Sequence, residues 1–444
     1  MHLLIAIVLL ISLCWNQFCA PSEPDSVLKI SMLVALLALV APAVAAIQMC
    51  IVRKVASHPK RSTIGRFRLI AIFNTLLWAG TSIAMIAWLR WGDVVNCISV
   101  AQQIPLANEL LLLAPAVFSL VCSWAVIVIA LPSRNIATGS TRCSMFLMWL
   151  RMQVTFVIAP ILFAFLVTDC ISIASTMTLT PIGETVLWIL AAIAIIGATV
   201  FYPKLILLIW PTKKIEDPTQ QERFNQLFQR CGMRPLPVHI WQTGNSMINA
   251  AAVGIVPGTE VILVSDLLMQ KFDDEEIDAI MMHEIGHVRH FHCIKRIAMI
   301  IVPLIALGLD QSLNLGLHST IANSEWLVSQ FGSLTEFLPA IAFLLYLLIV
   351  IKTVFRKMEF EADRFAVESL AGESTTHSVE LALEKMAVIY PRTVDRQSGL
   401  HPSIRQRLAY AMQVRAELEP TENTSAEHPV PAPHSISLDP VAAK

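Results

Sequence analysis

The first half of the chain alternates long apolar stretches with short polar loops. A helix needs roughly 20 apolar residues to cross the ~30 Å hydrocarbon core of a bilayer. We therefore predict a helical membrane domain over residues 1–210, with about six spans. The candidate spans are Leu3–Ala20, Ile30–Val52, Leu69–Leu89, Leu110–Leu131, Met145–Val167 and Thr185–Trp210.

Two features of this domain leave alternatives open. Leu3–Ala20 has the length of a signal peptide, but it lacks a positively charged start and a small-x-small cleavage site, so we expect it to be retained as an anchor. Polar residues in or beside spans are costly in lipid and should face the interior of the helix bundle. They either mark a functional path or simply pair helices. These residues are Glu109, Arg151, Gln153 and Asp310.

Positive charge in the loops predicts the orientation, because short loops rich in Lys and Arg stay in the cytoplasm. The loop between the fifth and sixth spans, residues 168–184, has no Lys or Arg, whereas Lys213 and Lys214 follow the sixth span. The segment after Trp210 should therefore be cytoplasmic, and a periplasmic or lumenal placement is the alternative. The loop between the second and third spans should lie on the same cytoplasmic side, because it is rich in Lys and Arg. It carries Arg53, Lys54, Lys60, Arg61, Arg66 and Arg68.

After Trp210 the pattern becomes that of a soluble unit. A polar linker, residues 211–218, leads into an amphipathic helix over Thr219–Cys231 and a strand over Pro237–Gln242. Two further strands, Ile248–Val253 and Glu260–Ser265, flank a Pro-Gly turn and predict a hairpin. The hairpin is either purely structural or supplies an edge to which an extended peptide adds as a strand.

A helix with metal-binding chemistry follows the hairpin. Asp273 and Glu276 fit a capping box, so the helix should begin there. His283 and His287 are four residues apart and project from one face, with Glu284 beside them, which is the H-E-x-x-H pattern of zinc sites. In a chain of this length and composition the pattern arises by chance only about 0.01 to 0.02 times.

A third ligand is available downstream at Glu359. Two His and one Glu leave one zinc position open, as in catalytic sites. Asp363, one helical turn later, would then accept the outer N–H of a ligand histidine. Between the two halves of the site, the apolar stretches Ile297–Leu309 and Phe337–Ile351 predict a two-span hairpin that returns Glu359 to the face of His283.

We expect five segments overall. The membrane domain, 1–210, precedes a catalytic segment, 211–296, the two-span hairpin, 297–351, and a second catalytic segment, 352–416. The second catalytic segment should form helices over 359–372 and 378–390. The remaining segment, 417–444, is acidic, rich in Pro and Ser, and without apolar periodicity, so we expect a disordered tail.

Composition supports an integral membrane protein and excludes other classes. Hydrophobic residues make up 55% of the chain and charged residues only 15%. A formal net charge of −1 and the lack of basic, aromatic-rich runs offer no surface for nucleic acid. The nine Cys residues include no C-x-x-C pair, so we interpret them as small hydrophobic residues.

The sequences His283-Glu284-Ile285-Gly286-His287 and Glu359-Phe360-Glu361-Ala362-Asp363 together resemble those of the integral membrane zinc peptidases of family M48, which includes the CAAX prenyl endopeptidase and HtpX types. Asn249-Ala250-Ala251-Ala252 is similar to that family's Asn-Ala-Phe-Ala strand, with Ala251 in place of Phe. His401-Pro402 and Arg407 fit as well, so the resemblance covers roughly residues 218–411.

The resemblance implies a mostly α, polytopic membrane protein that carries a small α+β, gluzincin-type zinc peptidase domain at the membrane surface. It implies one Zn²⁺ per chain, held by His283, His287 and Glu359, with Glu284 and His401 as catalytic residues, His401 steadying the oxyanion or a substrate carbonyl. Asp363 and a buried Arg407 would support the ligands. Asn249 and Ala250 would lie on the substrate strand. The six upstream spans and the Ala251 position depart from the family, so prenyl specificity is not inherited.

The expected activity is that of a zinc metalloendopeptidase, which hydrolyses peptide bonds of membrane-associated or misfolded polypeptides through a zinc-activated water, with Glu284 as general base. Two alternatives remain: a sensor-transducer of the antibiotic-responsive metallopeptidase type, and a non-catalytic membrane scaffold or transporter. His290 and His292 point partly away from the ligand face, and we do not expect them to bind the metal.

Single engineered cysteines test the predicted orientation. In the proposed topology Ser62→Cys is cytoplasmic and Thr176→Cys is on the opposite side of the membrane. A membrane-impermeant thiol reagent added to intact cells should therefore label position 176 and leave position 62 unmodified. Labelling of position 176 from the cytosol, with position 62 protected, would reverse the topology.

Overall fold

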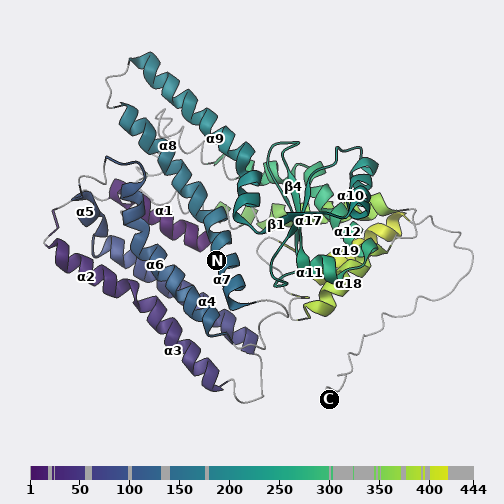
Figure 1. The fold of residues 1–444 in the computed structure, drawn as a ribbon, viewed down its shortest axis with the longest axis horizontal. Coiled ribbons are helices and arrows are strands. Elements are labelled where there is room, and N and C mark those ends of the chain that lie inside the picture. Colours follow the sequence, from purple (N-terminus) through teal and green to yellow (C-terminus); the bar gives the residue numbers. More distant parts are fainter. Residues whose placement is uncertain are drawn as a thin grey trace, which may run out of the picture.

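The structure of the protein is a computed structural model. It describes residues 2–18, 23–24, 26–55, 63–98, 103–131, 141–175, 180–299, 302–303, 324, 345–346, 349–350, 352–371, 377–391, 394–395 and 401–418. Long helices from the first half of the chain lie on one side, and a small sheet with its covering helices lies on the other (Figure 1). The expected fold class, a mostly helical polytopic membrane protein with a small α+β unit, is confirmed.

Within the described part of the first half, five helical segments are long and apolar enough to cross a membrane. The first apolar stretch forms a helix of 17 residues, about 25 Å long, which falls short of a ~30 Å core. The described helices are α1 His2–Phe18, α2 Val27–Ala38, α3 Val40–Val55, α4 Thr63–Ala87, α5 Trp91–Asn96, α6 Ala107–Ile129, α7 Arg142–Gln153, the π-helix η2 Val154–Ile158, α8 Ala159–Ser175 and α9 Pro181–Ile209.

One face of the short helix α1 packs against the other helices of the bundle. Its residues Ile5 and Leu9 are buried in one apolar cluster with Trp78 of α4. Tryptophan N–H groups also satisfy backbone carbonyls of α6. Pro115 has no N–H to bond the carbonyl of Leu111, and the Trp91 indole donates to that oxygen at 3.2 Å instead.

The second half of the described chain combines a four-stranded sheet with several helices. The strands are β1 Thr212–Lys214, β2 Val238–Trp241, β3 Ala250–Val253 and β4 Val261–Ser265. The helices are α10 Pro218–Arg230, α11 Asp266–Lys271, α12 Asp274–Arg289, α17 Lys352–Leu370, α18 Ser378–Ile389 and α19 Ile404–Leu418. The predicted helices over 219–231, 359–372 and 378–390 are confirmed within a few residues at most boundaries, although α17 begins earlier than expected.

Strand order β1-β2-β4-β3 places β3 at one edge of the sheet. The predicted hairpin is confirmed, because β3 pairs antiparallel with β4, while β2 pairs parallel with β4. Residues 211–218 were expected to be a linker, and this prediction was wrong in part. Thr212–Lys214 form β1 and pair antiparallel with β2, a contact that depends on the folded sheet rather than on local apolar periodicity.

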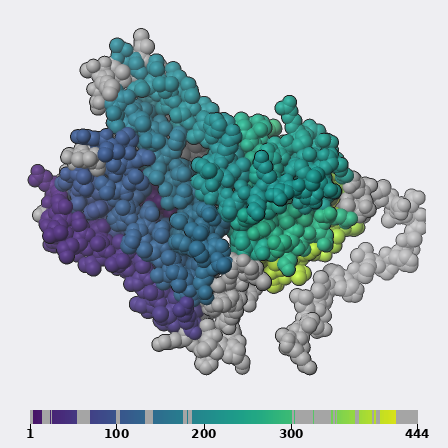
Figure 2. All heavy atoms as spheres, viewed as in Figure 1, coloured from purple at the N-terminus to yellow at the C-terminus, as the bar shows by residue number. Residues whose placement is uncertain are grey.

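The sheet is covered on both faces. One face carries Ile262 and Val264 against the buried side of α12. The other carries Leu263 and Trp241 against Met148 of α7 and Ile206 of α9. The soluble unit is therefore packed directly on the membrane helices, and the two are in contact in the space-filling view (Figure 2).

Two tryptophans mark this junction. Trp210, at the end of α9, stacks on Trp241 of β2 with ring centroids 4.4 Å apart. Its indole N–H donates to the Thr155 hydroxyl of the π-helix at 3.0 Å.

Gln153, one of the polar residues expected to face the bundle interior, is buried, whereas Asp310 lies outside the described residues.

Helix α12 begins as predicted. Asp273 is its N-cap, and the backbone N–H of Asp273 donates to Glu276 at 2.8 Å to complete the capping box. Most of the predicted two-span hairpin, 297–351, and the predicted tail, 417–444, lie outside the described residues. The division into five segments therefore stays a prediction.

Helices α12 and α17 cross closely at Gly286. A Cβ atom at this position would lie 3.1 Å from the Phe365 ring and 3.3 Å from the Ala362 Cα. Both distances are tighter than ordinary van der Waals contact. The glycine thus permits the approach of the helix that carries His283 to the helix that carries Glu359.

Gly286→Val should separate these helices and lower the free energy of unfolding by about 1–3 kcal/mol, the usual cost of overpacking a tight contact. Thermal unfolding of the purified protein in detergent measures the effect as a lower midpoint temperature. Gly197→Val in α9 is the matched control, since a Cβ at Gly197 meets nothing within 4 Å. Equal midpoints for the two variants would contradict the close-packing role of Gly286.

Candidate active site

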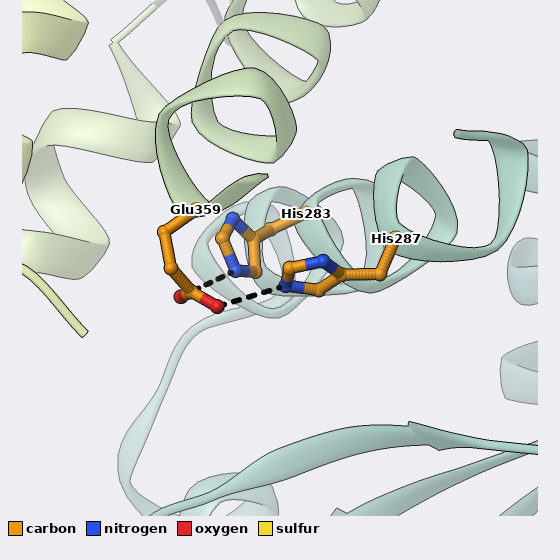
Figure 3. Close-up of side chains that lie close together, drawn as sticks. All are labelled: His283, His287 and Glu359. Atoms are coloured by element: carbon orange, nitrogen blue, oxygen red, sulfur yellow. Dashed lines mark ion pairs between the residues drawn. The ribbon is translucent and has the colours of Figure 1, made fainter. Parts of the chain in front are cut away.

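Two helices that are distant in sequence bring three potential metal ligands together. His283 and His287 project from α12 toward Glu359 of α17 (Figure 3). The Nε2 atoms of the two histidines lie 3.8 Å and 3.5 Å from the Glu359 carboxylate oxygens. One ligand atom from each residue lies within 4.8 Å of the others, and this is the only such group of His, Cys, Asp and Glu among the residues that the structure describes.

The charge state of these side chains suits a divalent cation. Burial alone would raise the pKa of Glu359, but a hydrogen bond from His401 and the nearby His283 hold it well below its ordinary value. Burial, followed by the proximity of His283, holds the pKa of His287 well below its usual range, so its ring is neutral. A neutral imidazole and an ionised carboxylate are ligands that Zn²⁺ prefers, so the residues present fit the metal.

Glu359 is almost completely buried and has partners on both oxygens. The Arg296 guanidinium donates to Oε1 at 2.9 Å, and His401 Nδ1 lies 2.7 Å from Oε2. His401 comes from the start of the last described segment and is about half exposed. The structure thus places this predicted residue against the third predicted ligand, at the open side of the site.

A buried ion pair fixes the orientation of His283. The Asp363 carboxylate lies 2.9 Å from His283 Nδ1 and accepts two hydrogen bonds from Arg407, at 2.6 and 2.9 Å. Burial would raise the pKa of Asp363, but Arg407 and His283 together outweigh burial and lower it. With Nδ1–H donated to the ionised Asp363, the Nε2 lone pair of His283 is directed toward Glu359.

Glu284 sits between the ligands and the edge of the sheet. It is buried, and its Oε2 accepts a hydrogen bond from the backbone N–H of Ala252 at 2.9 Å. Burial raises the pKa of Glu284 against the opposing charge of His283. A carboxyl group with a raised pKa exchanges protons more readily near neutral pH, as a general base or acid requires.

The hydrogen bond to Glu284 also shows how β3 is oriented. Asn249 pairs with Ser265 of β4 through its backbone, so Ala250 and Ala252, one and three residues further on, direct their N–H and C=O groups away from the sheet. This free edge borders a cavity of about 440 Å³. The cavity is lined by Asn249 and Ala250, by the residues of the site, and by apolar side chains of α18 such as Leu383.

The structure therefore brings together every site residue that the sequence indicated: His283, Glu284, His287, Glu359, Asp363, His401, Arg407, Asn249 and Ala250. Their functional roles stay predictions. Contacts from Arg296 and from the Ala252 N–H were not anticipated. A backbone donor has no signature in the sequence, and Arg296 follows α12 without a recognisable motif.

A further contact was also missed. His292 lies with its Nδ1 2.7 Å from Nδ1 of His287, and its Nε2 is 3.0 Å from Glu361. Burial lowers the pKa of His292 to about 4, although Glu361 opposes the shift, so the ring is neutral at neutral pH. The sequence could not place this residue, because its position depends on the left-handed backbone of Phe291 (φ 54°) just beyond the helix end.

The chain is similar to known peptidases. Residues 215–415 match the model of peptidase family M48. The CAAX prenyl protease 1 homolog of Dictyostelium discoideum is 28% identical over 235 residues, which cover 49% of this chain and 53% of that protein. The protease HtpX homolog of Bacillus pumilus is 24% identical over 169 residues, which cover 36% of this chain and 52% of that protein. The chain thus spans about half the length of these curated relatives.

The fold has a counterpart among solved structures. The crystal structure of S. mikatae Ste24p superposes with a TM-score of 0.53 and 15% sequence identity, over 88% of this chain and 100% of that chain. At this identity the likeness concerns the fold alone. Together with the apolar helices, these relationships show an integral membrane protein in which residues 215–415 have the sequence of a family M48 peptidase.

Proposed function

We propose that the protein is a zinc-dependent membrane endopeptidase that cleaves polypeptides. The observation that carries the proposal is the convergence of His283, His287 and Glu359 beside the buried Glu284, at the free edge of β3. The match of residues 215–415 to family M48 supports peptidase chemistry. A scaffold or transporter would not require an acid-base carboxylate beside three ligands.

The metal and Glu284 divide the chemistry. Zn²⁺ held by His283, His287 and Glu359 would act as a Lewis acid that polarises a water molecule and the substrate carbonyl. Glu284 accepts the proton of the attacking water and passes it to the leaving amine. The Ala252 N–H holds the Glu284 carboxylate at 2.9 Å, which keeps this group beside the ligands while it gains and loses its proton.

His401 is positioned to act on the substrate carbonyl. Its ring contacts the Glu359 carboxylate, and about half of the side chain is exposed toward the cavity. With Nδ1–H donated to Glu359, the ring can donate only as an imidazolium, through Nε2–H, to a carbonyl oxygen that gains negative charge during attack. We therefore assign His401 as a stabiliser of that oxygen and not as a proton acceptor.

The edge of β3 supports an extended polypeptide as substrate. The N–H of Ala252 is already donated to Glu284, so we propose that a substrate strand would add to the sheet at the outward backbone groups of Ala250. The small side chains of β3 leave room for substrate side chains. Because the sheet packs on α7 and α9, we propose that substrates are membrane-associated or misfolded polypeptides that reach the site at the cytoplasmic membrane surface.

Glu284→Gln should retain zinc and lose proteolysis. The amide oxygen can still accept from the Ala252 N–H, but it cannot take a proton, so the cleavage rate should fall by about 10²–10⁴-fold. Cleavage of an unfolded polypeptide by the detergent-purified protein, together with its zinc content, tests both parts. Glu275→Gln, an exposed carboxylate in the first turn of the same helix, is the control.

Parent-like cleavage by Glu284→Gln would rule out this mechanism. The same variant also serves to find substrates. Polypeptides that accumulate in cells with Glu284→Gln, and not in cells with the parent, are candidates for direct cleavage, and quantitative proteomics of the membrane fraction measures them.

Glu359→Gln should lose zinc as well as activity. The substitution replaces a carboxylate that stays ionised despite burial with a neutral amide, a much poorer zinc ligand. After dialysis against a weak chelator, the variant should contain well under one zinc per chain while the parent keeps it. Glu368→Gln, on the same helix and paired with Arg364, should behave as the parent. Full zinc retention by Glu359→Gln would exclude Glu359 as a ligand.

A further inference from the structure

His292 contacts a metal-ligand candidate from a position with no access to solvent. Helix α12 ends at His290, and the left-handed Phe291 turns the chain so that the His292 ring faces back toward His287. The side chain of His292 is fully buried. Its Nδ1 lies 2.7 Å from His287 Nδ1, and its Nε2 lies 3.0 Å from Oε2 of Glu361. These contacts form a chain from Glu361 through His292 to His287.

The chemistry of the Glu361–His292–His287 contacts fixes the direction of each hydrogen bond. An ionised Glu361 can only accept, so Nε2 of His292 carries the hydrogen. In a neutral imidazole the other nitrogen is then an acceptor, so His292 Nδ1 accepts from His287 Nδ1–H. His287 is left with its lone pair on Nε2, the atom that lies 3.5 Å from Glu359.

We propose that Glu361, acting through His292, sets the tautomer and the ring orientation of His287 and so tunes the zinc affinity of the site. Both are positioning residues, since neither is among the three grouped ligands. The inference rests on the proposed function, because it takes His287 to bind zinc through Nε2. Ligand histidines whose outer N–H partner is removed typically bind metal about 10–100-fold more weakly.

The two candidate ligand histidines are thus oriented by different hydrogen-bonded partners. His283 donates directly to Asp363, which is fully buried and paired with Arg407. His287 reaches its carboxylate only through a second imidazole, and that carboxylate, Glu361, is 52% exposed. The orientation of His287 therefore depends on a group at the surface, whereas that of His283 does not.

Zinc affinity of the purified full-length protein tests the inference. His292→Leu removes the acceptor, and the zinc dissociation constant, measured by competition with a chromophoric chelator, should rise about 10–100-fold. His292→Asn keeps an oxygen near the place of Nδ1 and should stay within about threefold of the parent. His290→Asn is the matched control, because His290 lies beside His292 without a hydrogen bond to a ligand among the described contacts.

Glu361→Ala removes the carboxylate that His292 contacts, at an exposed position where misfolding is not a concern. It should also weaken zinc binding by about tenfold or more, whereas Glu368→Ala should not. Thermal unfolding of the metal-free proteins shows whether the variants keep the parent's stability. The visible spectrum of the Co²⁺-substituted protein gives a second readout, because a rotated His287 changes the ligand field of the bound ion.

The outcomes separate this inference from the proposed function. If the parent protein binds no zinc, the proposed function itself is wrong. If the parent binds zinc, parent-like zinc affinity in His292→Leu or in Glu361→Ala would overturn the proposal that Glu361 and His292 orient His287. Equal weakening in His292→Asn and His292→Leu would also overturn it, since loss of the imidazole ring rather than of the hydrogen-bond acceptor would then explain the effect.

Discussion

The close crossing of α12 and α17 is the constraint on which the site depends. His283 and His287 come from one helix and Glu359 and Asp363 from the other, so neither helix carries a complete set of ligands. Position 286 has no side chain where Ala362 and Phe365 pack against it, and even a Cβ atom there would push on these neighbours. Packing at this glycine thus helps polar groups that are distant in the sequence to meet.

The crossing also concentrates charge, which has to be balanced. Glu284, Glu359 and Asp363 are all buried within one site, and isolated buried carboxylates would be strongly destabilising. Arg407 pairs with Asp363, Arg296 with Glu359, and the Ala252 N–H with Glu284. Glu359 and Asp363 are held ionised, while Glu284 lacks a direct cationic partner among its hydrogen bonds and has a raised pKa. The environment thus distinguishes two carboxylates that bind cations from one that can exchange a proton.

Much of this arrangement could be predicted from the sequence, and the exceptions have a common cause. The capping box at Asp273, the spacing of His283 and His287, and the Pro-Gly turn of the hairpin are local signals, and the structure follows them. Strand β1 has no such signal, because its three polar residues become a strand only by pairing with β2. The contact of His292 with His287 depends on one left-handed residue, and the bond from Ala252 to Glu284 on a backbone N–H, so no side-chain pattern reports either.

The stacked pair Trp210 and Trp241 has a mechanical consequence. It ties the end of α9 to β2, and Thr155 of the π-helix holds the same indole from a second span. Since β2 pairs with β4 and β4 with β3, the edge of β3 is coupled through the sheet to two membrane helices. The catalytic unit therefore cannot swivel freely above the bilayer. If the protein cleaves polypeptides as proposed, the scissile bond would have to reach a site whose position relative to the membrane helices is set by this packing.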